Sequence, residues 1–181
     1  MDKFSADSLR FLLLQSPLLN GEDFTLQDKD VGDVARKLGM IWNMYDFFTM
    51  YAEVDGWEYD PDKAADLNPD DVKNPLDKWV ISRVHQLNQE ISMNMDGYNI
   101  PDAMSPILPF LDDASNWFVR RSRRRFWKSE DDDDKAQAYR TLHYVLLKFA
   151  VLVAPFTPFL AEELYQNLGG GVESVHLLDW P

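Results

Sequence analysis

The chain has 181 residues, no cysteine and a formal net charge of -13, and 45% of its residues are hydrophobic. This length and apolar content predict one main domain with a sizeable core and exclude a disordered tail. The lack of cysteine excludes disulfides and thiolate metal sites, and it fits a reducing cytoplasm at least as well as secretion. The acidic balance argues against nucleic acid as a partner unless basic residues are locally clustered, because phosphate binding depends on lysine and arginine.

Apolar residues at helical spacing predict helices in the first half of the chain. A short helix is expected at 5–15, where Ser5 can cap the first turn. A long amphipathic helix is expected at 28–53, although Gly39 weakens it by up to about 1 kcal/mol relative to alanine. The acidic stretch 53–78, which contains three prolines, is expected to be a solvated connection between helices.

Capping residues and prolines define the next two helices. Asn74-Pro75 supplies an N-cap and a proline at the first helical position, and predicts a helix that runs to about residue 95. A third long helix is expected at 101–127, with a kink or break near 105–110, because two prolines there each remove an amide donor and clash with the preceding turn. Beyond Phe110 this helix is expected to be regular.

Further helices are predicted in the remainder of the chain. A helix is expected at 134–153, and another begins at Thr157 as N-cap and ends at the glycines 169–171. The segment 172–180 is expected to be extended. There is no internal repeat and no alternating pattern long enough for a sheet, so the sequence predicts an all-α bundle of four to five helices with a short N-terminal helix and an extended C-terminal tail.

Arginines are concentrated in one stretch of this acidic chain, from Asn116 to Trp127, which holds five of them. At 100° per residue, an arc of roughly 100° carries only apolar or small residues: Leu108, Leu111, Ser115, Phe118, Val119, Ser122 and Phe126. The opposite side carries Asp113, Trp117, Arg120 and Arg124, with Arg121, Arg123 and Trp127 on its flanks. The stretch therefore predicts a helix with a core face and a cationic face that bears a tryptophan.

The cationic face suits RNA. Guanidinium groups bind phosphate through paired hydrogen bonds, and an exposed indole stacks on an unpaired base, which contributes about 1 to 3 kcal/mol. The alternative is a helical scaffold or protein-interaction module. In that case Asp112, Asp113, Glu130 and the aspartates 131–134 would pair with the arginines at the surface, and a neighbouring helix would cover Trp117.

Other chemistry is weakly indicated. His85, His143 and His176 lie on different segments without ligand spacing, so no metal site is predicted. Glu162-Glu163 has no expected nucleophile beside it and is interpreted as a solvated helix face. The longest apolar run, 145–158, is interrupted and shorter than the roughly 20 residues that a membrane span requires. We therefore expect no catalytic residue and no membrane span in this chain.

Residues 115–127 resemble the signature helix of isoleucyl-tRNA synthetases, a family of class I aminoacyl-tRNA synthetases. Further stretches are similar to the same enzymes in the same order, and together they cover nearly the whole chain: Ser5 to Arg10, Leu38 to Phe48, Leu76 to Arg83, Ala154 to Glu163 and Ser174 to Pro181. The equivalent domain of a valyl-tRNA synthetase is the alternative within this group, because it shares the bundle and some of these motifs.

The resemblance implies an anticodon-binding domain within a larger ligase that attaches isoleucine to its tRNA with ATP. It implies a segment 1–26 that contacts the stem and links to the catalytic domain, a helical bundle at 27–170 and an extended segment at 171–181. The chain has neither a His-Ile-Gly-His nor a Lys-Met-Ser-Lys-Ser motif, so we expect it to be non-catalytic by itself. The parent enzyme is expected to use ATP, Mg²⁺ and Zn²⁺, none of them in this chain.

The resemblance also implies partners and contact residues. The expected partners are the anticodon stem-loop of tRNA(Ile) and the catalytic domain of the same protein, with the chain itself monomeric and cytoplasmic. Trp117 is expected to stack on a base, and phosphate or base contacts are expected from Arg120, Arg121, Arg123 and Arg124. Arg36 and Lys37 are expected to add contacts to the RNA backbone.

Overall fold

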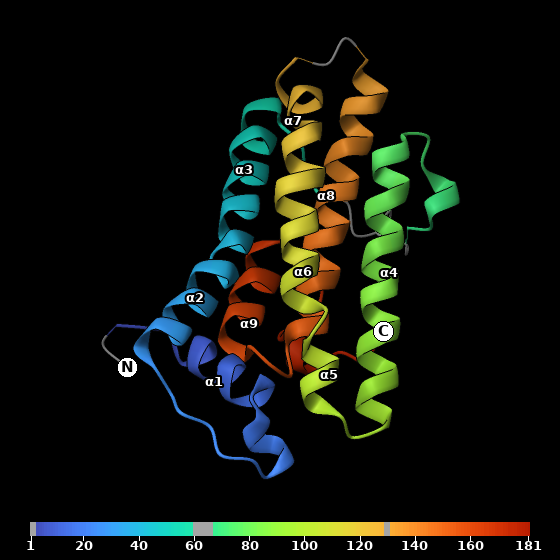
Figure 1. Cartoon of the computed structure of the whole chain (residues 1–181). Helices are drawn as coiled ribbons and strands as arrows, with labels where there is room; N and C mark the ends of the chain where they lie inside the picture. Colours follow the sequence, from blue (N-terminus) through green and yellow to red (C-terminus); the bar gives the residue numbers. More distant parts are fainter. Residues whose placement is uncertain (1–2, 60–66, 129–130) are drawn as a thin grey trace.

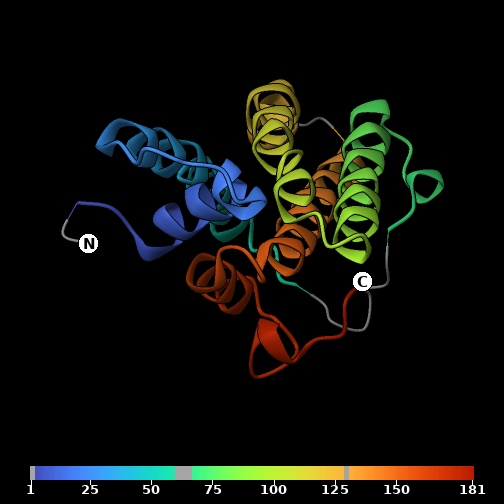
Figure 2. The same ribbon diagram turned by 60° about the horizontal axis from the view of Figure 1, so that its bottom comes forward.

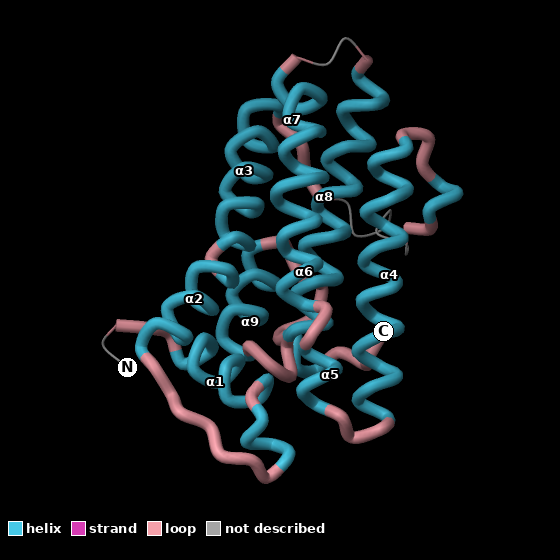
Figure 3. Tube along the Cα trace, viewed as in Figure 1, coloured by secondary structure: helices cyan, strands magenta, loops and turns pink. Residues whose placement is uncertain are grey.

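The computed structural model describes residues 3–59, 67–128 and 131–181, and all regular structure within these ranges is helical (Figure 1). The longer helices run alongside one another and are joined mostly by short loops, as Figure 3 shows. The predicted all-α fold is confirmed, and the described helices form a bundle.

The chain begins with α1 (Ala6–Gln15), followed by the 3-10 turn η1 (Pro17–Asn20). The predicted cap is present, because the side chain of Ser5 accepts a hydrogen bond from the backbone N–H of Ser8 at 3.2 Å. The cap satisfies one of the amide groups that the first turn of a helix leaves without a partner.

The helix expected at 28–53 is in fact two helices, α2 (Asp28–Leu38) and α3 (Met40–Asp55), so the prediction of a single helix was wrong. They meet at Gly39, where the chain changes direction (Figure 1). A Cβ atom at Gly39 would lie 3.3 Å from the carbonyl oxygen of Ala35, which is a tight approach. The glycine therefore permits a compact junction between the two helices.

The next long helix is α4 (Pro75–Asp96), and it starts where predicted. The side chain of Asn74 accepts a hydrogen bond from the N–H of Leu76 at 3.0 Å. A 3-10 turn, η3 (Pro69–Asp71), precedes α4. The connection expected at 53–78 includes residues 60–66, which lie outside the described residues.

The predicted break near 105–110 is also present. It separates α5 (Ile100–Met104) from α6 (Ile107–Asp112), and the chain between them forms a turn at Ser105 and Pro106. Proline has no amide hydrogen to donate, so the helical hydrogen bonding is interrupted at this point.

The stretch beyond Phe110 was expected to be a regular helix, but it contains a π-helix, η4 (Asp113–Val119), before α7 (Arg120–Trp127). A π-helix has more residues per turn, so the buried side of the helix moves around its axis along the chain. Ser115 and Leu108, which regular spacing placed in the core, are only partly buried. The buried positions of α6, η4 and α7 are Ile107, Phe110, Leu111, Ala114, Phe118, Val119, Ser122 and Phe126.

At the centre of the bundle is α8 (Asp132–Val153), which begins slightly earlier than the expected 134. The side chain of Asp131 caps it by accepting the N–H of Asp133 at 3.0 Å. Helices α3, α4, α7 and α9 all pack against α8, so it is buried on more than one side.

The last helix, α9 (Pro158–Asn167), starts after Thr157 as predicted, but the Thr157 side chain does not cap it. Its hydroxyl instead donates to the carbonyl of Val153 at 3.3 Å. The cap comes from another helix: the carboxylate of Asp7 on α1 accepts the N–H of Leu160 at 2.6 Å. The cap of α9 thus depends on a residue from the opposite end of the chain.

The segment expected to be extended at 172–180 contains a 3-10 turn, η5 (Val175–Leu177), so that expectation was wrong in part. Figure 2 shows the segment passing below the bundle and ending near α4. There the indole N–H of Trp180 donates to the hydroxyl of Ser92 at 2.7 Å.

Candidate functional site

The arginine-rich stretch lies on η4 and α7, at one end of the bundle, with α3 and α4 on its two sides (Figure 1). The inner side of this stretch packs through Phe118, Ser122 and Phe126, which are all 0% exposed. Trp117 is 48% exposed. The outer side also carries four exposed arginines: Arg120, Arg121, Arg123 and Arg124. The structure therefore gives α7 the core side and the cationic side that helical spacing predicted.

Arg125, the fifth arginine of the stretch, points into the bundle and is 11% exposed. Its guanidinium donates to both carboxylate oxygens of Asp77 at 2.6 and 2.8 Å, and to Asp134 at 2.7 and 2.9 Å. Burial raises the pKa of the Asp77 carboxyl, an effect that Arg125 offsets only in part, whereas the same guanidinium lowers the pKa of the more exposed Asp134. Arg125 therefore joins α4, α7 and α8.

A second ion pair joins α4 to the π-helix. Arg83 donates through two nitrogens to one oxygen of Asp113, at 2.9 and 3.1 Å. Regular spacing placed Asp113 on the cationic side, where its charge would oppose that of the arginines. The ion pair with Arg83 neutralises this carboxylate.

Aromatic rings lie beside the arginines on both flanks of α7. The ring centroids of Trp79 on α4 and Trp117 are 6.4 Å apart, with the ring planes inclined by 60°. The guanidinium of Arg121 lies 4.4 Å from the centroid of the Trp117 ring, and that of Arg123 lies 5.7 Å from the Phe47 ring on α3. Sequence reasoning did not include Trp79 or Phe47 in the site, because helical spacing relates residues within one helix only.

Arg125 pairs with Asp134, as a structural role would require, but the other four arginines of the stretch show no such pairing in the described ranges. Among those residues, no ion pair joins a carboxylate to Arg120, Arg121, Arg123 or Arg124. Asp112 instead accepts a hydrogen bond from Asn116 at 2.6 Å. Glu130, one of the carboxylates considered as a partner, lies outside the described residues. The exposure of Trp117 likewise disfavours the scaffold interpretation, which needs this ring to be covered.

Arg36 and Lys37 lie elsewhere, at the last turn of α2. Both are exposed, and Arg36 pairs with Asp33 at 2.8 Å. In Figure 1, α2 lies at the far end of α3 from α7, so the structure does not bring these two residues to the arginine stretch.

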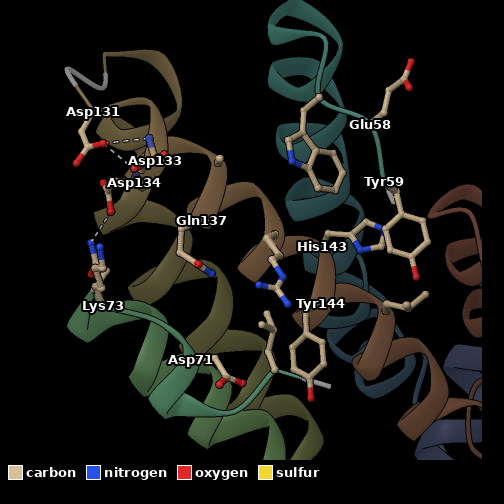
Figure 4. Close-up of a pocket in the computed structure, with 16 residues that line it drawn as sticks. Glu58, Tyr59, Asp71, Lys73, Asp131, Asp133, Asp134, Gln137, His143 and Tyr144 are labelled. Carbon is tan, nitrogen blue, oxygen red and sulfur yellow. Dashed lines mark hydrogen bonds between the residues drawn. The ribbon is translucent and has the colours of Figure 1, made fainter. Parts of the chain in front are cut away.

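A cavity of about 770 Å³ opens on another side of α8, next to Tyr59 and the segment that leads into α4 (Figure 4). The ring of His143 stacks on Tyr59 with centroids 4.1 Å apart, and its Nε2 is hydrogen-bonded to the carbonyl of Leu168 at 2.8 Å. Burial lowers the pKa of His143. The lining also contains Lys73 and Arg140, but carboxylates outnumber them: Glu58, Asp71, Asp131, Asp133 and Asp134. The cavity therefore differs in charge from the arginine side of α7 and does not belong to that site.

Other residues singled out in the sequence have structural partners. Glu162 is not simply a solvated side chain, because its carboxylate accepts hydrogen bonds from the hydroxyl of Ser174 at 2.8 Å and the N–H of Val175 at 2.9 Å. Within the described ranges, no group of three or more histidine or carboxylate side chains could hold a metal ion. In the same part of the chain, no helix is both long and apolar enough to cross a membrane.

An all-helical bundle that exposes arginines and a tryptophan on one helix defines a candidate RNA-binding domain. Residues 77–181 match the family model for the anticodon-binding domain of tRNA ligases, and the chain belongs to this family.

Similar proteins agree with this assignment. The chain is 43% identical over 188 residues to the isoleucine–tRNA ligase of Dehalococcoides mccartyi strain CBDB1. It is 37% identical over 193 residues to that of Treponema pallidum strain Nichols. Both comparisons cover 100% of this chain and 18% of the relative, so the chain spans less than a fifth of the length of these ligases.

A solved structure shares the fold. It is the ternary complex of the Agrobacterium radiobacter K84 AgnB2 LeuRS with tRNA and LeuAMS. The TM-score is 0.66 at 16% sequence identity, and the superposition covers 99% of this chain and 20% of the LeuRS chain. At this level of identity the comparison supports the arrangement of the helices.

Proposed function

We propose that this chain is the tRNA-binding part of an isoleucine–tRNA ligase and that the anticodon stem-loop of tRNA(Ile) binds to the outer side of η4 and α7. The contact residues are Trp117, Arg120, Arg121, Arg123 and Arg124. The observation that carries the proposal is a set of exposed arginines, without carboxylate partners among the described residues, around a tryptophan that is 48% exposed.

The charge distribution favours this side of the molecule for RNA. The chain carries a formal net charge of -13, so most of its surface repels phosphate. The exposed arginines of α7 form a local exception, and their guanidinium groups can bind phosphate oxygens through paired hydrogen bonds. RNA that approaches the chain is therefore directed to α7.

The ligase activity would belong to the whole protein. Attachment of isoleucine to tRNA with ATP, and the binding of ATP, Mg²⁺ and Zn²⁺, would take place outside this chain, and the reaction would occur in the cytoplasm. The segment 1–26 would link the bundle to the catalytic domain. Arg10 on α1 donates to the carbonyl of Pro155 at 3.0 Å, so this segment is itself attached to the bundle at the turn between α8 and α9.

The experiment is a measurement of tRNA binding across a salt series. The variants are Arg120→Glu/Arg124→Glu and a control with the same change in charge, Lys29→Glu/Lys73→Glu, at two exposed lysines, one on α2 and one in the loop before α4. We expect the arginine variant to bind at least tenfold more weakly, with the slope of log K against log salt reduced by about 1.5 to 2. The control should retain both the affinity and most of the slope.

Equal effects of the two variants would show that only the overall charge matters, and the proposed side of α7 would be wrong. A third variant, Arg36→Glu/Lys37→Glu, tests the expected backbone contacts from α2. If its slope equals that of the wild type, the RNA does not reach α2.

A further inference from the structure

We propose that Trp79 on α4 and Trp117 on η4 together hold one unpaired nucleobase of the bound RNA loop. This inference deepens the proposed function and rests on it. It makes the RNA-binding surface a two-helix surface, with a base site on the flank of α7 that faces α4.

The geometry of the two rings is the first observation. Their centroids are 6.4 Å apart and their planes are inclined by 60°, so the indoles contact each other in a tilted arrangement and are not stacked face to face. Trp79 is partly buried, whereas Trp117 is 48% exposed. A base can therefore lie against one ring with its edge toward the other, as aromatic groups prefer.

The second observation is that ion pairs join the two helices that carry these rings. Two ion pairs join α4 to the η4–α7 helix, Arg83 with Asp113 at 2.9 Å and Arg125 with Asp77 at 2.6 Å. Because the two helices run in opposite directions, Trp79 and Trp117 lie in the part of the interface that these pairs hold together. The angle between the rings is thus set before any ligand binds, which reduces the entropy cost of binding.

The charge around the rings is the third observation. The guanidinium of Arg121 lies 4.4 Å from the centre of the Trp117 ring. Asp113 and Asp77, the carboxylates in this interface, are both neutralised by arginine. Because Arg121 lies over one face of the Trp117 ring, a base would stack on the other face, while the arginine attracts the phosphate of the nucleotide.

A tilted tryptophan pair also occurs in ordinary packing, so the test must separate packing from binding. Trp79→Leu removes the ring and keeps an apolar side chain, and Trp180→Leu is the matched control, because Trp180 is 43% exposed and lies near Ser92, at the other end of α4. Binding of the anticodon stem-loop RNA to the full 181-residue chain is measured across a salt series. The thermal unfolding of each variant is measured in parallel.

We expect Trp79→Leu to weaken RNA binding by about tenfold with an unchanged salt slope, because stacking releases no counterions. The Trp180→Leu variant should bind within twofold of the wild type. An abasic nucleotide, placed at each position of the loop in turn, should identify one position at which the wild type loses about tenfold and Trp79→Leu loses nothing further. A role in packing alone would not produce this dependence on one base.

A second measurement does not need a folded variant. RNA carrying 5-iodouridine at that loop position, irradiated in complex with the wild-type chain, should form a crosslink to the peptide that contains Trp79 or Trp117. If crosslinks map only to peptides that contain neither, or if Trp79→Leu binds as tightly as the wild type while Arg120→Glu/Arg124→Glu binds weakly, the base site is overturned and the proposed function stands. If wild-type binding does not depend on Arg120 and Arg124, the proposed function fails, and this inference fails with it.

Discussion

Arg125 on α7 binds both carboxylate oxygens of Asp77 on α4, at 2.6 and 2.8 Å, across 48 residues of sequence. Asp77 is 0% exposed and would be a buried, unpaired charge without this arginine. The pair thus separates the roles of neighbouring arginines: Arg125 holds the helices together, whereas Arg124 remains exposed on the outer side of α7.

Replacement of Arg125 by methionine is expected to lower the free energy of unfolding by about 3 to 5 kcal/mol, because a buried carboxylate loses its partner. Arg124→Met, one residue away, should change stability by no more than about 0.5 kcal/mol. Urea denaturation of both variants measures the difference. Equal, small losses would show that the ion pair contributes little to the stability of the fold.

The cap that α1 provides to α9 gives a second prediction. Asp7→Ala leaves the N–H of Leu160 without its acceptor and is expected to destabilise the chain by about 1 to 2 kcal/mol. Asp23→Ala removes an exposed carboxylate from the segment between η1 and α2 and serves as the control. Thermal unfolding measures both, and the long-range cap is contradicted if the two variants unfold at the same temperature.

At Ser122, in contrast, removal of a polar group is not expected to lower stability. It is 0% exposed, and its hydroxyl has no hydrogen-bond partner among the described residues. Ser122→Ala is therefore expected to leave stability unchanged or raise it by up to about 1 kcal/mol, because a buried polar group without a partner is removed.

Ser16 provides the comparison for Ser122, because its hydroxyl donates to the carbonyl of Leu13 at 2.7 Å. Ser16→Ala should cost about 1 kcal/mol in the same urea titration. A clear loss of stability in Ser122→Ala would mean that the Ser122 hydroxyl does have a partner.

The buried histidine predicts a dependence of stability on pH. Burial lowers the pKa of His143 in the folded chain, so below about pH 6.5 the unfolded state binds a proton that the folded state does not. The contribution of neutral His143 to the free energy of unfolding is therefore complete above the pKa of the unfolded state. It is lost as the pH falls below that value, and the free energy of unfolding then declines by at most about 1.4 kcal/mol per pH unit.

This pH dependence can be checked by urea unfolding between pH 7 and 5. His143→Gln should flatten the decline in stability over this range, even though the variant is less stable overall. His176→Gln, at an exposed position, should decline as the wild type does. If the decline is the same in all three proteins, carboxylates cause it and His143 does not.

Most of the helices could be predicted because their signals are local. Ser5 and Asn74 act as N-caps within three residues of the amide groups they bind, and the prolines near 105–110 interrupt their own helix. The failures at Gly39 and at the π-helix have a different origin. Regular spacing allowed a continuous helix in both cases, and spacing within one helix does not indicate where the chain changes direction or register.

The candidate site was also predicted only in part, because spacing within one helix does not show which residues of other helices lie beside it. Helical spacing was sufficient to place Trp117, Arg120 and Arg124 on the outer side of one helix. It could not identify Trp79, which joins them from α4, and it could not show that Arg36 and Lys37 lie at the far end of α3.

The helical class and the two-sided character of the arginine stretch could be predicted from local spacing, because both depend on residues within one or two turns of each other. The tertiary structure alone decided that Arg125 pairs inward with Asp77, that Asp7 caps α9, and that Trp79 lies beside Trp117. These contacts join residues that are far apart along the chain, and the spacing within a single helix carries no information about which other helix packs against it.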